Sequence, residues 1–416
     1  MMIAGFADSM GRRPAYIICF VIYLAANLGL ALQNSYPALM VFRCVQSGGS
    51  SSTVALANGL VGDIITSTER GSYIAYASLG SMLGPSLSPI IGGLISQYLD
   101  WHWLFWFLLI FGGTFFVFLF LFQPETCRQV VDDGSIPPPL LNWSVTDWIR
   151  HRHRRSRGEP VEREKMIDLR ENNTTRFPNP LPSLKVLLDK ETALILIAIA
   201  FIFACLYALM TGSTTSFQEI YHFNSIEVAL MYLPFAAGGI VSAFTTGRLL
   251  DWNYRRHAHR AGMPVIKNVR QDLSNFQIER ARLEVALPMY YIGIACMISY
   301  GWFMNQKVNL AGPIIILVIC GYALNVTSQA LNALIVDLWP GRSASASAAN
   351  NLVRCELGAA ASAAIRPMTD AMGNGWAYTT TGLVAVAASP CLWVMMRFGM
   401  EWRREKRDKA LANAHS

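Results

Sequence analysis

Two short motifs in this chain combine an acidic residue with a pair of arginines, a combination that can make and break ion pairs. The first occupies residues 5–14 (GFADSMGRRP) and the second occupies residues 247–256 (GRLLDWNYRR). A carboxylate beside a helix end, here Asp8 or Asp251, can meet a neighbouring helix N-terminus, worth about 0.3–1 kcal/mol, or a basic partner. The two motifs are therefore candidates for contacts that change with conformation.

An arginine also lies inside each of two other stretches that are rich in small and apolar residues. Arg43 opens the sequence RCVQSGG, with Gln46 three residues later, and Arg354 belongs to the sequence NNLVRC at 350–355. A guanidinium in hydrocarbon is expensive, so such a residue normally faces the interior of a helix bundle. Glu356 lies two positions after Arg354, and positions i and i+2 do not share a helix face. Glu356 is therefore either a protonatable group or an acid neutralised from elsewhere, and we favour a structural role.

Small residues recur at helical spacing in the sequence GSMLGPSLSPIIGG. Gly80 and Gly84 lie four residues apart, which makes a flat face for close contact between helices. Pro85 removes a backbone donor and bends the helix. The stretch ends in Gly92 and Gly93, so the whole segment is expected to pack closely.

Three amide side chains form a stripe on another predicted helix. Asn325, Gln329 and Asn332 follow one another at spacings of four and three residues, which places them on one face. In lipid, such a stripe must face protein or a water-filled cavity. Contact with a bound molecule and hydrogen bonding between helices are both open interpretations.

The elements that carry these residues are membrane-spanning helices. Charged residues make up 15% of the 416-residue chain, against about 25% in a soluble domain. A helix of about 20 residues crosses a hydrocarbon core of roughly 30 Å, and residues 102–122 contain no Asp, Glu, Lys or Arg. The fold class is an all-α polytopic membrane protein. Ten spans are expected at 14–34, 37–62, 71–96, 101–122, 191–217, 226–247, 284–303, 311–336, 342–365 and 375–397.

The basic residues indicate how these spans are oriented. If the first loop is cytoplasmic and the spans alternate, 30 of the 34 Lys and Arg fall on the cytoplasmic side, with Arg342 and Arg397 counted there. This asymmetry is the positive-inside rule. The net charge of +7 is then a topology signal, which argues against a nucleic-acid partner. Because ten is even, both termini are expected in the cytoplasm.

One long hydrophilic segment divides the spans into four plus six. The expected organisation is residues 1–122, a cytoplasmic central loop at 123–190, a six-helix half at 191–397 and a cytoplasmic tail at 398–416. The loop is a solvated linker in one interpretation. In the other, its basic run RHRHRR docks on anionic lipid headgroups through an interfacial helix beside Trp143 and Trp148.

The motifs together resemble those of major facilitator superfamily transporters. Residues 5–14 and 247–256 are similar to the duplicated loop of that family, and residues 43–49 and 80–93 are similar to its R-x-x-Q-G and antiporter helices. Ser47 stands where Gly is usual, and three residues are inserted before the final Gly pair. The amino-acid sequence at residues 247–256 is characteristic of the fungal drug:proton antiporter group, and that at 350–355 is similar to it. Since the family has two six-helix halves, the resemblance implies that the first two helices are missing here.

The resemblance also implies roles for the charged residues. Arg43, with Gln46, would take part in proton coupling or gating, unless it reaches an interface or pairs permanently with one carboxylate. Arg12 and Arg13 would pair across the halves and bias an inward–outward equilibrium. Alternatively, these arginines only set topology. Arg354, and Glu356 where relatives carry an apolar residue, are further candidates for coupling, as are Asp8 and Asp251.

In this family the substrate cavity lies between the halves. Its expected lining here is Tyr207, Thr214, Gln218, Asn325, Gln329 and Asn332. The implied function is proton-coupled export of hydrophobic small molecules by alternating access. A nutrient/proton symporter and a non-transporting truncated fragment are the alternatives.

The remaining expectations follow from that assignment. We expect no enzyme activity, cofactor or metal, because no nucleotide loop, metal cluster or catalytic arrangement is found in the sequence. The partners are a small-molecule substrate, protons and the lipid bilayer. The protein is expected to be a monomer, in the plasma membrane rather than the vacuole.

Overall fold

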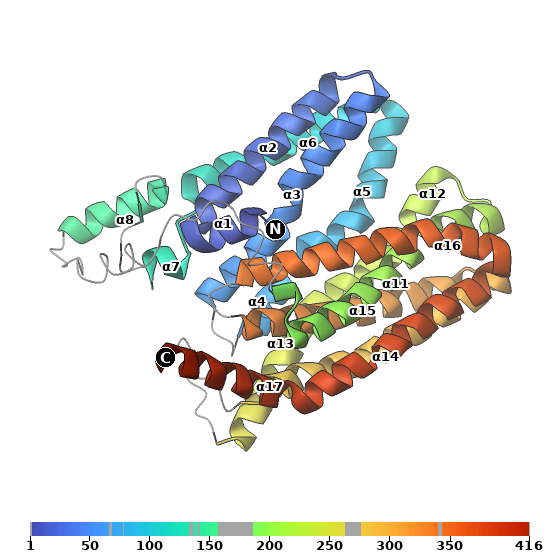
Figure 1. Cartoon of the computed structure of the whole chain (residues 1–416). Helices are drawn as coiled ribbons and strands as arrows, with labels where there is room; N and C mark the ends of the chain where they lie inside the picture. Colours follow the sequence, from blue (N-terminus) through green and yellow to red (C-terminus); the bar gives the residue numbers. More distant parts are fainter. Residues whose placement is uncertain are drawn as a thin grey trace. The chain divides into compact units, whose positions relative to one another are not determined.

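The computed structural model describes residues 2–65, 69–77, 79–132, 136, 138–139, 142–156, 186–262, 276–339 and 343–415, and over these ranges the regular secondary structure is α-helical (Figure 1). The helices are α1 (Met2–Met10), α2 (Arg12–Leu32), α3 (Tyr36–Ile64), α4 (Arg70–Ala77), α5 (Leu79–Tyr98), α6 (His102–Phe122), α7 (Arg128–Val131), α8 (Val145–Ser156), α11 (Lys190–Tyr221), α12 (Ser225–Leu230), α13 (Tyr232–Arg260), α14 (Ile278–Asn305), α15 (Ala311–Leu338), α16 (Ser343–Ala388) and α17 (Pro390–His415).

The chain forms two compact units, each assembled from segments far apart in the sequence. Unit 1 comprises residues 1–64, 94–185 and 339–349, and unit 2 comprises residues 65–93, 186–338 and 350–416. Helices α5 and α16 therefore each contribute to both units.

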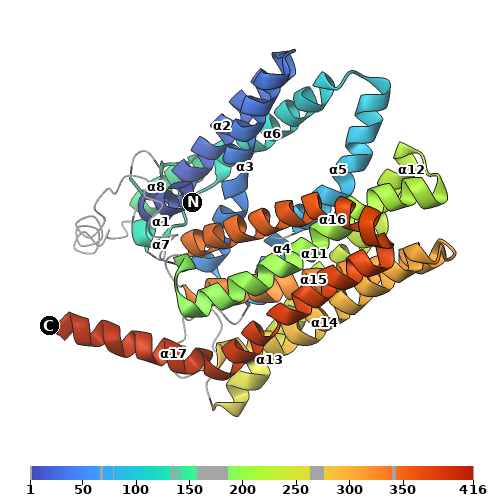
Figure 2. The ribbon, with the colours of Figure 1, turned by 45° about the vertical axis from the view of Figure 1, so that its right-hand side comes forward.

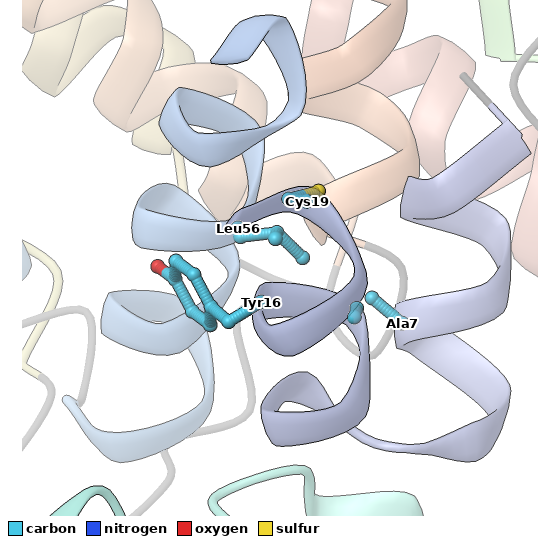
Figure 3. Packing of buried hydrophobic residues seen from close by; sticks show 5 residues of the cluster. Ala7, Tyr16, Cys19 and Leu56 are labelled. Atoms are coloured by element: carbon cyan, nitrogen blue, oxygen red, sulfur yellow. The ribbon is translucent and has the colours of Figure 1, made fainter. Parts of the chain in front are cut away.

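Helix α2 is the centre of unit 1, where it packs against α3 and α6. Ala7, Tyr16, Cys19 and Leu56 belong to a buried cluster that joins α1, α2 and α3 (Figure 3). The backbones of α2 and α3 approach closely at Gly49, where an added Cβ would lie 2.9 Å from the carbonyl oxygen of Cys19. Small residues permit such close packing, which suits a helix pair in lipid.

Helix α15 is the centre of unit 2, where it packs against α13 and α14. Gly238 and Gly321 bring α13 and α15 together, since a Cβ on Gly238 would lie 2.1 Å from the carbonyl oxygen of Val318. Helix α16 is kinked at Gly373, whose φ of 76° is a conformation that glycine adopts without steric cost. Figure 2 shows the same helices from a second direction.

Within the described ranges, seven segments are long and apolar enough to cross a membrane. They are residues 12–32, 102–122, 190–221, 226–260, 278–305, 311–338 and 343–406. The last has 64 residues, long enough for two crossings. Helix α3, which is rich in Gly and Ser, and helix α5 are not among the seven, so the ten expected crossings stay a prediction.

Several helices extend beyond the expected spans. Helix α13 continues to Arg260, past the expected end at 247, so the motif at 247–256 is helical where a loop was expected. Helix α14 begins at Ile278, before the expected start at 284, and α17 continues to His415 through the segment expected as a tail. The residues of that tail include Glu, Arg, Lys and Ala, which favour helix. The expected division of the chain into domains at 122, 190 and 397 stays a prediction.

The central loop is described only in part. Helices α7 and α8 lie in its first half, and residues 133–135, 137, 140–141 and 157–185 lie outside the described residues. Helix α8 begins in a capping arrangement, in which Ser144 Oγ donates to Asp147 and the Asp147 N–H donates back to Ser144 Oγ at 3.1 Å. This local hydrogen bonding explains why a helix starts directly after Trp143.

Candidate functional site

The first polar cluster in unit 1 is built around Arg12, whose side chain is 1% exposed. Its Nη1 donates to Asp8 at 2.6 Å and its Nε donates to Asp63, at the end of α3, at 2.8 Å. The second oxygen of Asp8 accepts from the backbone N–H of Ser345 at 2.9 Å and from its hydroxyl at 2.5 Å. A buried guanidinium is thus neutralised by two carboxylates, one of which also caps the first turn of α16.

Glu125 binds the backbone at the start of α2. Its carboxylate accepts hydrogen bonds from the backbone N–H of Arg12 at 2.8 Å and from that of Arg13 at 3.3 Å. Asn142 donates to the same carboxylate at 2.9 Å and to the Met10 carbonyl. The first residues of the central loop therefore fix the opening motif in place.

Arg13 lies next to Arg12 in sequence but has different partners. Its Nη2 donates to the carbonyl of Phe120 at 2.6 Å, its Nη1 donates to the carbonyl of Trp143, and its guanidinium lies over the Phe120 ring. Within unit 1 the two arginines are thus held by different groups, Arg12 by carboxylates and Arg13 by backbone carbonyls. The expected pairing of these arginines across the halves stays a prediction.

Arg43 belongs to a second polar cluster in unit 1. Its Nη1 donates to Gln46 at 3.1 Å, and Gln46 donates to Asn27 of α2 at 2.7 Å. The guanidinium lies 5.1 Å from the centre of the Phe105 ring. Gln46 and Asn27 are buried whereas Arg43 is exposed, so the amides connect an accessible cation to the helix interior.

Asp251 belongs to a charged cluster at one end of unit 2. It accepts from Ser72 of α4 at 2.6 Å and lies 3.9 Å from Arg282. Arg282 and Arg70 both donate to Asp337, at 3.2 and 2.5 Å. This cluster joins α4, α13, α14 and α15, and its ion pairs are buried.

Three glycines of the 80–93 segment have no described atom close to the position that a side chain would take. A Cβ built on Gly80, Gly84 or Gly93 meets no atom within 4 Å in the described part of the chain. Gly92 is half-buried, and the side chain of Pro85 lies outside the described residues. The helix continues from Leu79 to Tyr98 through this proline, and its role in close packing stays a prediction.

Unit 2 contains a cavity of about 440 Å³ beside α11, a size typical of small-molecule sites. Two of the expected residues, Tyr207 and Thr214, line it, whereas Gln218 is exposed further along α11. The Thr214 and Tyr232 hydroxyls lie 2.5 Å apart, and Tyr232 also donates to the Met210 carbonyl. The lining residues are Pro89, Leu206, Tyr207, Met210, Thr211, Thr214, Thr215 and Tyr232, and none of them is charged.

The amide stripe of α15 is buried between helices. Gln329 donates to Ser242 of α13 at 3.1 Å, and Asn332 accepts from Asn350 of α16 at 2.7 Å. Asn325 donates within its own helix to the Gly321 carbonyl. These contacts favour the interhelical interpretation, and contact with substrate stays a prediction.

Arg354 and Glu356 are separated by the structure. The half-buried Arg354 lies 4.6 Å from the centre of the Phe203 ring, and its Nε donates to Asn351 at 2.8 Å. Glu356 is exposed. Among the described residues, neither side chain has a partner of opposite charge within 4.0 Å.

The sequence interpretation did not single out several residues that complete these clusters. Each lies in an expected loop, within three residues of the end of a predicted span. An acidic residue that closes a span is the available signal, although it does not identify the partner. The residues are Asp63, Arg70, Glu125, Arg282 and Asp337. Over the described ranges, no group of three or more His, Cys, Asp or Glu side chains could hold a metal ion.

A bundle of long apolar helices, with buried ion pairs at helix ends and an uncharged cavity, is the architecture of a multi-pass membrane protein. The chain belongs to the Major Facilitator Superfamily, whose profile matches residues 1–363. The all-α fold expected from the sequence is thereby confirmed.

Curated relatives from fungi support this assignment. The chain is 55% identical to the MFS-type transporter phiD of a fungal species (strain ATCC 74256) over 98% of this chain and 62% of phiD. It is 52% identical to the MFS-type transporter tstD of Talaromyces stipitatus, over 99% of this chain and 74% of tstD. Citrate exporter 1 of Aspergillus niger is 32% identical over 98% of this chain and 78% of that protein. The chain thus spans less than two thirds of the length of phiD.

Among solved structures, the human organic anion transporter MFSD10 (TETRAN) is similar in fold. The TM-score is 0.61 at 17% identity, over 94% of this chain and 79% of that chain. At this identity the similarity shows the fold alone.

Proposed function

We propose that the chain is a proton-coupled exporter of hydrophobic small molecules that works by alternating access, as in the drug:proton antiporter group. The observation that carries this proposal is the cavity beside α11, whose walls combine apolar and aromatic side chains with a few hydroxyl groups and carry no charge. Sites of this composition bind drug-sized molecules by burying apolar surface while a few polar groups fix orientation.

The direction of transport is supported by a relative. Citrate exporter 1 of Aspergillus niger is named as an exporter and matches 98% of this chain. The chain and this relative belong to one family, so export is the favoured direction here as well. Uptake by symport would instead raise the amount of substrate that cells retain when they express the chain.

Proton coupling is assigned to the polar clusters of unit 1. Gln46 connects the exposed guanidinium of Arg43 to the buried Asn27 through hydrogen bonds. A change of charge near Arg43 would therefore alter the hydrogen bonding between α2 and α3. Asp8 and Arg12 would act as a gate, because the first turn of α16 can leave α1 only when Asp8 releases Ser345. We place the protein in the plasma membrane as a monomer with both termini in the cytoplasm.

A cell assay tests this proposal. Cells that express the chain are loaded with the neutral hydrophobic dye Nile red, and retention of the dye is followed with and without a protonophore. Expression should lower dye retention, and the protonophore should abolish the difference. Arg43→Ala should do the same, whereas Arg366→Gln, at an exposed arginine of α16, should leave export unchanged. Higher retention on expression would contradict export, and export that survives the protonophore would contradict proton coupling.

A further inference from the structure

Helix α11 and the part of α16 that belongs to unit 2 lie side by side (Figure 2). Phe203, Tyr207 and Thr211 follow one another at four-residue spacing on α11, and Arg354, Gly358 and Ser362 do so on α16. Residues at this spacing lie on one face of a helix. The two faces meet in three successive pairs.

Each pair makes a contact of a different kind. The Arg354 guanidinium lies 4.6 Å from the centre of the Phe203 ring. A Cβ on Gly358 would lie 2.9 Å from Cδ2 of Tyr207, so the absent side chain lets the tyrosine ring lie against α16. Thr211 donates to Ser362 at 3.2 Å. The first pair is charged, and the next two pairs are uncharged.

The uncharged pairs reach the cavity, and the charged pair lies one turn away from it. Tyr207 and Thr211 line the 440 Å³ cavity, and Phe203 precedes Tyr207 by one turn, a rise of about 6 Å. The rings of Phe203 and Tyr207 are 6.4 Å apart. The Arg354 guanidinium is therefore within reach of a molecule that occupies the cavity and extends along α11.

Arg354 is also placed where a charge is costly. It follows the start of α16 at Ser343 by about three turns, or about 17 Å, which is near the middle of a hydrocarbon core of roughly 30 Å. Its contacts are a ring face and the Asn351 amide, and no carboxylate lies within 4.0 Å of it among the described residues. By contrast Arg366, on the same helix, pairs with Glu219 at 2.8 Å and with Asp370 at 3.2 Å.

These observations indicate that the site prefers a negatively charged ligand. This inference rests on the function proposed above. We propose that the substrate is an amphipathic organic anion, whose apolar body fills the cavity and whose carboxylate binds Arg354. A guanidinium held on a ring face keeps its planar edge of donors free for bidentate binding of a carboxylate. The aromatic ring and the amide orient the cation, and the substrate supplies the negative charge that the described protein does not.

Three probes of one shape test this assignment on the purified full chain in detergent. They are 2-naphthylacetate, its neutral methyl ester, and the cation 2-(2-naphthyl)ethylammonium. Binding is measured at pH 7 by quenching of tryptophan fluorescence. The wild-type chain should bind the carboxylate at least tenfold more tightly than the cation. Arg354→Gln should weaken binding of the carboxylate by about tenfold or more, the loss expected for a charged hydrogen-bonded pair, and should change binding of the ester by less than twofold.

Two further variants complete the test. Arg354→Lys should retain part of the carboxylate preference, because it keeps the charge but not the planar donors. Arg366→Gln is the matched control and should bind all three probes as the wild type does. Unchanged ester binding shows that a variant is folded.

The outcomes separate this inference from the proposed function. If the wild type shows no preference for the carboxylate, or binds none of the probes, the inference is wrong. It is also wrong if Arg354→Gln weakens all probes equally, since the arginine would then be structural. Export of Nile red from cells can persist in each of these cases. The proposed function is contradicted only by the cell assay, if expression does not lower dye retention or if export survives the protonophore.

Discussion

The carboxylate of Asp8 accepts two hydrogen bonds from Ser345, a residue 337 positions away, one from the backbone N–H and one from the hydroxyl. Ser345 lies in the first turn of α16, where backbone N–H groups have no partner within the helix. Asp8 therefore serves as a cap supplied by another helix. Its other oxygen binds Arg12, so a single carboxylate connects α1, α2 and α16.

Replacing Asp8 should loosen this junction. Asp8→Ala removes both acceptors and leaves the buried Arg12 with Asp63 as its remaining carboxylate partner, which should cost about 1.5–3 kcal/mol. Cys127 is a natural reporter, because its buried thiol lies 3.6 Å from the Asp8 carbonyl. In a variant that retains Cys127 as its only cysteine, Asp8→Ala should raise the rate of maleimide labelling about tenfold or more.

The chain offers a matched control for this experiment. Arg366 and Asp370 form an ion pair at the same four-residue spacing as Asp8 and Arg12, but both side chains are about half exposed. An exposed pair contributes about 0–1 kcal/mol, so Asp370→Asn should leave the labelling of Cys127 unchanged. Equal labelling in Asp8→Ala and the wild type would show that Asp8 does not hold the junction closed.

The sequence identified Asp8 and Arg12 as charged residues of one motif, but it did not identify the partners that they have in this junction. Asp8 and Arg12 lie four residues apart in a motif, and a cap or basic partner for Asp8 is a local expectation. Asp63 and Ser345 are 55 and 337 residues from Asp8, and ordinary residues such as these acquire a role only when helix packing brings them together. The helices themselves were predictable, because apolar length is a local property of the chain.

The cavity beside α11 shows the same division between what the sequence predicts and what packing decides. Tyr207 and Thr214 were expected in a cavity and line one, because both lie on an apolar helix with hydroxyls at helical spacing. The pattern did not distinguish Gln218, which is exposed, from these two. A periodic pattern gives the face of a helix, whereas the neighbour that covers it depends on packing.

Gly11 should tolerate no side chain. Its φ of 114° is disfavoured for other residues, and an added Cβ would lie 2.3 Å from a carboxylate oxygen of Glu125. Gly11→Ala should therefore lower the midpoint of thermal unfolding in detergent, with a strain of about 1–3 kcal/mol. Gly48→Ala is the control, since Gly48 is helical and no described residue comes within 4 Å of the built Cβ. A midpoint for Gly11→Ala equal to that of the control would argue against strain at this turn.

Gln329 and Ser242 should depend on each other for stability. Both are buried, and their hydrogen bond joins α15 to α13. Gln329→Ala and Ser242→Ala should each lower the thermal midpoint, and the double variant should lose less than the sum, with a coupling of about 0.5–3 kcal/mol. Asn325→Ala, whose amide bonds within its own helix, should show no coupling to Ser242. Additive losses combined with weaker probe binding would instead favour a substrate contact for Gln329.

The absence of a side chain at Gly358 should determine how much space the Tyr207 ring leaves for a ligand. A methyl group at this position would lie 2.9 Å from the tyrosine ring, and the ring must move because the helices pack closely there. Since Tyr207 lines the cavity, a displaced ring reduces the space for a bulky ligand more than for a small one. Gly358→Ala should weaken binding of 2-naphthylacetate about fivefold or more and that of phenylacetate by less than twofold, as overpacking by about 1 kcal/mol or more implies. Adding Tyr207→Leu should restore the larger probe, because the smaller side chain removes the clash. If both probes weaken equally and Tyr207→Leu restores neither, the ring does not form a wall of the binding site.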